Sequence, residues 1–136
     1  QEAAHLFATA LPNFFPVVDS HIQAMLTAQL TRRDVVLYFS YSGSTKELLD
    51  NLKIARERGA GVILITRFPK SPGAAYADVV LQCGSHEGPF QGGSVAARIA
   101  QLYVVDVLFS ELCRRDLEGC RERRELVAEV LSDKHI

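Results

Sequence analysis

The sequence has no excess of positive charge and no long apolar run. Lysine and arginine number 15 against 16 aspartates and glutamates, so the formal net charge is −1 and no overall basic field attracts nucleic acid. No apolar stretch is long enough to span a bilayer, and the first residues, Gln1 to His5, lack the basic start of a signal peptide. These absences argue against nucleic-acid binding, membrane contact and export, and we expect a cytoplasmic protein.

Cysteine is scarce, and metal-binding patterns are missing. The three cysteines, Cys83, Cys113 and Cys120, are an odd number without metal-site spacing. We interpret each as a small buried or half-exposed thiol, in keeping with a reducing cytoplasm. Histidine, aspartate and glutamate form no cluster with ligand spacing either, so we expect neither a metal ion nor another cofactor.

The length and composition suit one domain. With 136 residues, 48% of them hydrophobic and 23% charged, the chain is long enough to bury a core and is typical of a globular protein. It contains no internal repeat and no low-complexity segment. We therefore expect residues 1–136 to form a single domain.

One stretch organises the chain. An apolar run over 35–39 ends in four hydroxyl side chains around one glycine, and a helical pattern follows from Lys46. This order predicts a buried strand, a tight turn and a helix N-terminus. Unpaired amides and the macrodipole favour an anion there, above all a phosphate. We call residues 40–45 the serine loop. Its candidate ligand-binding residues are Ser40, Ser42, Gly43, Ser44 and Thr45.

A simpler interpretation is open for each of these residues. In this interpretation Thr45 or Ser44 serves merely as the helix cap, and Gly43 merely permits the turn. Four hydroxyls in six positions exceed what one cap needs, and ligands of open α/β sheets bind at the carboxyl ends of the strands. We therefore favour ligand binding by this loop.

Strands and helices alternate along the chain. The predicted strands are 14–18, 35–39, 62–66 and 78–82, the first of them at a sheet edge because it contains Pro16. The predicted helices are 3–11, 20–30, 46–59, 94–111 and 116–134, with one helical turn over 74–77. The spacing of Ser20 and Gln23 predicts a capping box. The alternation implies an α/β fold with a parallel sheet.

The predicted helix over 94–111 has little polar surface. Its apolar residues include Leu102, Tyr103, Val104, Val105, Val107, Leu108 and Phe109. Such a helix is buried or packs against another subunit. For a chain this small, core burial and a dimer contact are both open.

Five stretches of the sequence match one known family. They are 20–25, 34–36, 40–47, 59–66 and 93–102. On these motifs nearly the whole chain resembles the sugar isomerase (SIS) family, and most closely the effector domain of RpiR-type bacterial transcription regulators. The serine loop marks SIS domains in general, whereas the stretch over 93–102 and its continuation to Leu108 favour the regulator branch.

The resemblance implies a three-layer sandwich with a parallel sheet flanked by helices, of the flavodoxin-like or Rossmann-like kind. In such domains the S-x-S-G-x-T loop holds the phosphate of a phosphosugar, which carries over to the serine loop. Ser94, which opens the predicted helix over 94–111, is a further ligand-binding candidate. Position 44 is often acidic in the family, and the serine here adds a neutral donor. With the apolar helix over 94–111 in view, we also expect a homodimer or a higher homo-oligomer.

The chain departs from the family at its start. SIS domains usually begin with an apolar strand and a Gly/Ser loop, whereas this chain begins where the first helix is already under way. RpiR-type regulators also carry an N-terminal helix-turn-helix domain, which is not in this sequence. We therefore expect a fragment without the first strand, and we expect any DNA binding to belong to residues outside this chain.

An isomerase would need a general base near the bound sugar. The candidates are His21 in a predicted helix and His86 and Glu87 in the glycine-rich loop over 83–93. Each is more often an exposed or packing residue, and no two form a convincing acid–base pair. We therefore predict a phosphosugar sensor without turnover. The alternatives are a phosphosugar isomerase or related SIS enzyme, and a structural dimerisation module with a vestigial site.

Overall fold

A computed structural model of the chain describes residues 2–84, 95–132 and 134. The chain divides into two compact units, one formed by Val17–Gln101 and the other by Gln1–Pro16 together with Leu102–Ile136. Each unit contains its own cluster of buried hydrophobic side chains. The serine loop belongs to the unit Val17–Gln101.

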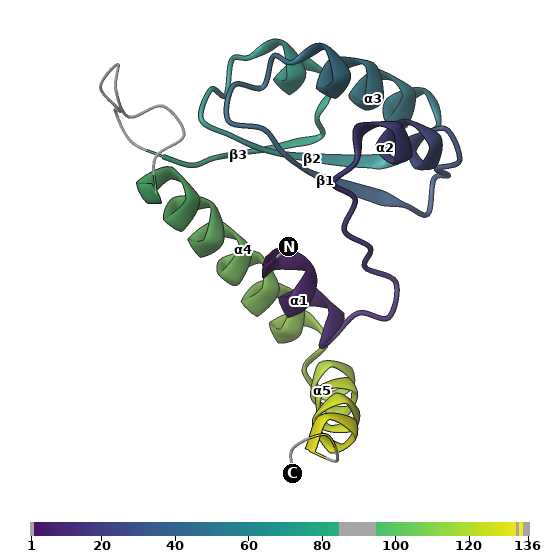
Figure 1. Cartoon of the computed structure of the whole chain (residues 1–136), viewed down its shortest axis with the longest axis vertical. Coiled ribbons are helices and arrows are strands. Elements are labelled where there is room, and N and C mark those ends of the chain that lie inside the picture. Colours follow the sequence, from purple (N-terminus) through teal and green to yellow (C-terminus); the bar gives the residue numbers. More distant parts are fainter. Residues whose placement is uncertain (1, 85–94, 133, 135–136) are drawn as a thin grey trace. The chain divides into compact units, whose positions relative to one another are not determined.

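The unit Val17–Gln101 is built on a parallel sheet of β1 (Val35–Phe39), β2 (Gly61–Thr66) and β3 (Val79–Gln82), in that spatial order. Helix α3 (Lys46–Glu57) connects β1 to β2, and a short 3-10 helix, η1 (Pro72–Tyr76), precedes β3. Figure 1 shows α3 and α2 (Ser20–Thr27) on the same face of this sheet. The predicted α/β class, with a parallel sheet flanked by helices, is confirmed.

The core of this unit lies between α3 and the sheet. Leu48, Leu52 and Ala55 recur at helical spacing on one side of α3 and are at most 2% exposed. They pack against Val62 and Leu64, which alternate along β2 and are equally buried. The buried side of α3 thus packs on the buried residues of the sheet. The position of the serine loop is therefore set by a rigid strand before it and a rigid helix after it.

The predicted strand over 14–18 does not form, and this prediction is wrong. Residues 15–19 have no regular structure, and Phe15 and Val18 are 74% and 75% exposed. Phe14 instead stacks on Phe7, with ring centroids 4.7 Å apart. Strand propensity needs a neighbouring strand to pair with, and here the aromatic side chain is used for packing.

The start of α2 is capped differently from the prediction. Asp19 is the N-cap residue, and its Oδ1 accepts hydrogen bonds of 2.9 Å from the amides of His21 and Ile22. Ser20 is already helical, and Gln23 donates from its side chain to the carbonyl oxygen of Val17 instead. The helix start is therefore confirmed, and the capping box is wrong.

The other unit consists of α1 (Glu2–Ala8), most of α4 (Val95–Arg115) and α5 (Leu117–Ser132). Phe7, Val105 and Phe109 lie in its buried cluster, and the rings of Phe7 and Phe109 meet edge to face. Tyr103 and Val107 on α4 are 70% and 49% exposed. Core burial therefore accounts for only part of the apolar surface of α4, and the contact with a second subunit stays a prediction.

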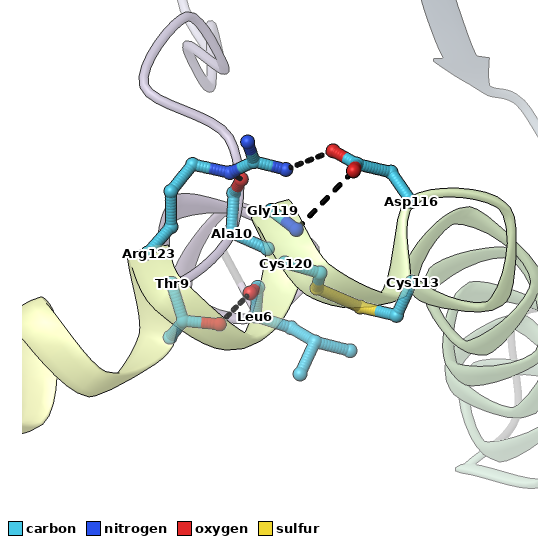
Figure 2. Close-up of a disulfide and its surroundings, with 8 residues drawn as sticks. All are labelled: Leu6, Thr9, Ala10, Cys113, Asp116, Gly119, Cys120 and Arg123. Atoms are coloured by element: carbon cyan, nitrogen blue, oxygen red, sulfur yellow. Dashed lines mark hydrogen bonds and ion pairs between the residues drawn. A yellow bond between two sulfur atoms is a disulfide. The ribbon is translucent and has the colours of Figure 1, made fainter.

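Two of the three expected thiols are paired. Cys113 and Cys120 form a disulfide across the junction of α4 and α5, with Cα atoms 5.4 Å apart (Figure 2). Arg123 beside them donates to Asp116 at 2.7 Å and to the carbonyl oxygen of Ala10 at 2.5 Å. The expectation of free thiols is wrong for this pair, because the turn between two helices brings together residues that the sequence alone does not pair. Cys83 is the buried free thiol that was expected.

Candidate anion-binding site

The serine loop leaves the carboxyl end of β1 and leads directly into α3. Its first amide, that of Ser40, donates to the carbonyl oxygen of Ile65 at 3.0 Å and so continues the pairing with β2. The turn begins after Ser40 and ends at Ser44 and Thr45. Ser42 is half-buried, whereas Ser44 and Thr45 are exposed. The structure therefore brings all five predicted loop residues together at the edge of the sheet where ligands of open α/β proteins bind.

The loop turns at Gly43, whose φ of +61° is a conformation that side chains rarely adopt. The Gly43 amide donates to Ser40 Oγ at 3.1 Å, and the Ser44 amide donates to Ser42 Oγ at 3.3 Å. A Cβ atom at position 43 would overlap Ser71 Oγ and lie 2.7 Å from Ser71 Cβ. Glycine is therefore required here both by the backbone and by the space behind it.

Helix α3 begins without a side-chain cap. Thr45 is the N-cap residue, but among the described residues its hydroxyl accepts no hydrogen bond from the first turn. The first intrahelical bond runs from the Leu49 amide to the Thr45 carbonyl, at 3.1 Å. The earlier amides of α3 have no acceptor within the helix. The interpretation that Thr45 only caps α3 therefore has no hydrogen bond to support it, and the helix start offers donors to an anion.

The end of β2, the second loop over 67–71 that follows it, and the start of η1 support the serine loop from behind. Thr66 Oγ1 donates to the carbonyl oxygen of Tyr41 at 3.1 Å, and the Arg67 amide donates to the same oxygen at 3.2 Å. The Gly73 amide donates to the carbonyl oxygen of Gly43 at 2.8 Å. The serine loop is thereby held at both ends of its turn before any ligand arrives, which lowers the entropy lost on binding.

The sequence predicts a loop over 67–73, but sequence reasoning gave it no part in the site. The signal was present, because neighbouring parallel strands end at the same edge of a sheet and the loop after β2 must lie beside the loop after β1. Cys83, just beyond β3, lies at the same edge, and its amide donates to the carbonyl oxygen of Thr66 at 3.0 Å. Burial raises the pKa of the Cys83 thiol, which keeps it protonated.

The other predicted site residues are not joined to the loop. His21 is exposed in the first turn of α2, where its amide donates to the N-cap residue Asp19. His86, Glu87 and Ser94 lie outside the described residues. Within the described part of the chain, no group of three or more metal-binding side chains is arranged around a common point, and no helix has the length and apolarity to cross a membrane.

The fold and the loop define the class: an α/β domain with a candidate anion site at the carboxyl edge of a parallel sheet. Residues 1–111 match the SIS domain family, and the chain belongs to that family. This agrees with the resemblance carried by the serine loop.

Curated relatives of the chain are bacterial transcription regulators. It is 38% identical over 118 residues to an uncharacterised HTH-type regulator of Caldanaerobacter subterraneus, a match that covers 87% of this chain and 42% of the relative. It is 34% identical over 100 residues to the HTH-type regulator RpiR of Escherichia coli K12, which covers 74% of this chain and 34% of that protein. The chain thus spans less than half the length of these relatives.

Solved structures with the same fold include a sugar-phosphate complex. NanR of Vibrio vulnificus complexed with ManNAc-6P superposes with a TM-score of 0.88 at 27% identity, over 97% of this chain and 50% of that one. The sugar isomerase domain of RpiR from Sphaerobacter thermophilus is 22% identical with a TM-score of 0.73, over 94% of this chain and 70% of that one. The second of these likenesses shows the shared fold.

Proposed function

We propose that this chain is the phosphosugar-binding effector domain of a bacterial RpiR-type transcription regulator, and that it senses a sugar phosphate without turnover. The observation that carries the proposal is the uncapped start of α3 beside the hydroxyls of Ser40, Ser42 and Ser44. Amides, hydroxyls and the helix dipole together suit a phosphate dianion. The kinship with HTH-type regulators and with the NanR complex supports the sugar phosphate as ligand.

The wider setting of the domain is part of the same proposal. DNA would be bound by residues outside this chain, as the kinship with longer HTH-type regulators suggests. The exposed apolar side chains of α4 favour a homodimer as the working form. The kinship with bacterial transcription regulators favours the cytoplasm as its location. Ligand binding would act by favouring one arrangement of the two subunits, which requires different ligand affinities in the two arrangements.

The test uses the 136-residue chain with ManNAc-6P, glucose-6P and inorganic phosphate. We expect a sugar phosphate to raise the melting temperature and to be recovered unchanged after long incubation. Ser42→Ala should weaken binding by about 1.5–3 kcal/mol, since it removes a hydroxyl from a charged phosphate. Ser132→Ala, which alters an exposed serine at the end of α5, is the matched control. Steady conversion of a sugar phosphate to an isomer would show that the protein is an enzyme. If none of the three compounds binds, the structural dimerisation module becomes the better interpretation.

A further inference from the structure

Ser71 holds a buried hydroxyl that its surroundings do not use. The residue is 9% exposed, and within the described part of the chain its Oγ has no hydrogen-bond partner. Buried polar groups in folded proteins are nearly always paired, because an unpaired one loses its bonds to water without replacement. An unpaired hydroxyl next to a ligand loop therefore points to a role in another state of the site.

The position of Ser71 would suit a helix cap, but the structure does not use it as one. Ser71 is the N-cap residue of η1, where a serine side chain ordinarily accepts from an amide of the first turn. The Gly73 amide donates instead to the carbonyl oxygen of Gly43, at 2.8 Å, and the Ala74 amide to the carbonyl oxygen of Ser71, at 3.0 Å. The Ser71 hydroxyl therefore makes no capping hydrogen bond to η1.

The hydroxyl lies directly behind the turn of the serine loop. A Cβ atom at Gly43 would overlap Ser71 Oγ and would also lie 3.1 Å from Thr66 Oγ1, so two hydroxyls of the second strand and its loop face this glycine. That of Thr66 is already bonded, since it donates to the carbonyl oxygen of Tyr41 and accepts from the Phe68 amide at 3.3 Å. The hydroxyl of Ser71, by contrast, is available for a hydrogen bond that forms when the turn at Gly43 changes conformation.

We propose that Ser71 is a positioning residue of the anion site, an inference that rests on the proposed function. In the free loop the Gly43 amide donates to Ser40 Oγ at 3.1 Å. An oxyanion competes for this amide, and because the peptide group is planar, turning its N–H outward turns the carbonyl of Ser42 inward. Ser71 Oγ–H then donates to that carbonyl oxygen. Ligand binding satisfies a hydroxyl that the free protein leaves unpaired, and this favours the bound state.

The test compares Ser71→Ala with the wild-type 136-residue chain, using whichever of ManNAc-6P, glucose-6P and inorganic phosphate stabilises the wild type. We expect the melting temperature of the free variant to rise, since the unpaired hydroxyl is gone, and its affinity for the anion to fall about tenfold, the size of one hydrogen bond. Thr66→Val is the matched control. It removes a hydroxyl that is bonded in the free protein, so it should lower the melting temperature.

Opposite changes in stability and affinity distinguish positioning from simple packing, which would move both in the same direction. Unchanged affinity of Ser71→Ala, or a lower melting temperature of the free variant, would overturn this inference and leave the phosphosugar site standing. If the wild type binds none of the three anions, the proposed function fails and the role of Ser71 fails with it.

Discussion

Asn51 Nδ2 donates a hydrogen bond of 2.7 Å to Tyr38 Oη, which ties α3 to β1 two residues before the serine loop begins. The Tyr38 hydroxyl donates in turn to Gln23 Oε1 of α2 at 2.8 Å. Asn51 is 3% exposed, and burial raises the pKa of Tyr38 although the bond from Asn51 opposes the shift. The two elements that frame the serine loop are therefore joined by a chain of hydrogen bonds as well as by apolar packing.

Loss of the central hydroxyl should destabilise this unit. Tyr38→Phe leaves the amide of Asn51 and the carbonyl oxygen of the Gln23 side chain without a shared partner in a largely buried place. We expect the free energy of unfolding to fall by about 1–3 kcal/mol, measured by urea denaturation. Tyr103→Phe, on a side chain that is 70% exposed, is the control and should change it by less than about 0.5 kcal/mol. Equal effects of the two variants would show that the polar chain adds nothing.

Gly43→Ala should damage the loop for two separable reasons. The positive φ disfavours alanine by about 1 kcal/mol or more, and the new Cβ meets Ser71. The double variant Gly43→Ala with Ser71→Gly removes the second cause and should recover part of the lost stability in thermal unfolding. Gly61→Ala is the control, because its Cβ would only come within 3.3 Å of a methyl group of Val35. No recovery in the double variant would mean that the backbone conformation alone demands glycine.

Reduction of the disulfide should loosen the junction of α4 and α5. Cys113 and Cys120 are seven residues apart, and closing so short a loop stabilises a protein by about 2–3 kcal/mol in the chain-entropy description. We expect a reductant to lower the free energy of unfolding of the wild type by that amount and to leave Cys113→Ser unaffected. Cys83→Ala, which removes the free thiol, should keep the full sensitivity to reductant. A wild type indifferent to reductant would contradict the cross-link.

The carboxyl group of Glu111 should titrate at an unusually low pH. Hydrogen bonds from Arg114 at 2.7 Å and from Arg115 at 2.9 Å lower its pKa from 4.5 to about 2. A pKa depressed by folding means that the ionised form favours the folded state. The contribution is complete above about pH 4.5 and is lost as the pH falls towards 2.

An NMR titration of the Glu111 carboxyl checks this prediction. Arg114→Gln removes the largest cause and should raise the pKa towards 4.5. Arg121→Gln is the control, since Arg121 pairs with Glu125 on α5 and should leave Glu111 unchanged. A wild-type pKa near 4.5 would show that these exposed contacts are not maintained in solution.

The predictions that succeeded rest on short stretches of chain. The strand over 35–39, the turn at Gly43 and the helix with Leu48 and Leu52 each depend on a few neighbouring residues, and each forms where it was predicted. The predicted burial of that strand is wrong, since Val35 and Phe39 at its ends are 65% and 39% exposed. The predictions that failed did so for two different reasons. The capping box at Ser20 is wrong because its neighbour Asp19 caps α2 one residue earlier. The strand over 14–18 is wrong because a strand needs a distant partner, and this run pairs with none in the described part of the chain.

The sequence by itself determined a strand, a turn and a helix that together gather amides and hydroxyls in the serine loop, because hydrophobic periodicity, glycine and helix termini act locally. Only the tertiary structure decided that Ser71, far along the chain from Gly43, fills the space behind that glycine, and that Cys113 meets Cys120. These contacts follow from how β2 aligns beside β1 and from the turn between α4 and α5. Such alignments depend on the packing of whole elements, which no short pattern of residues contains.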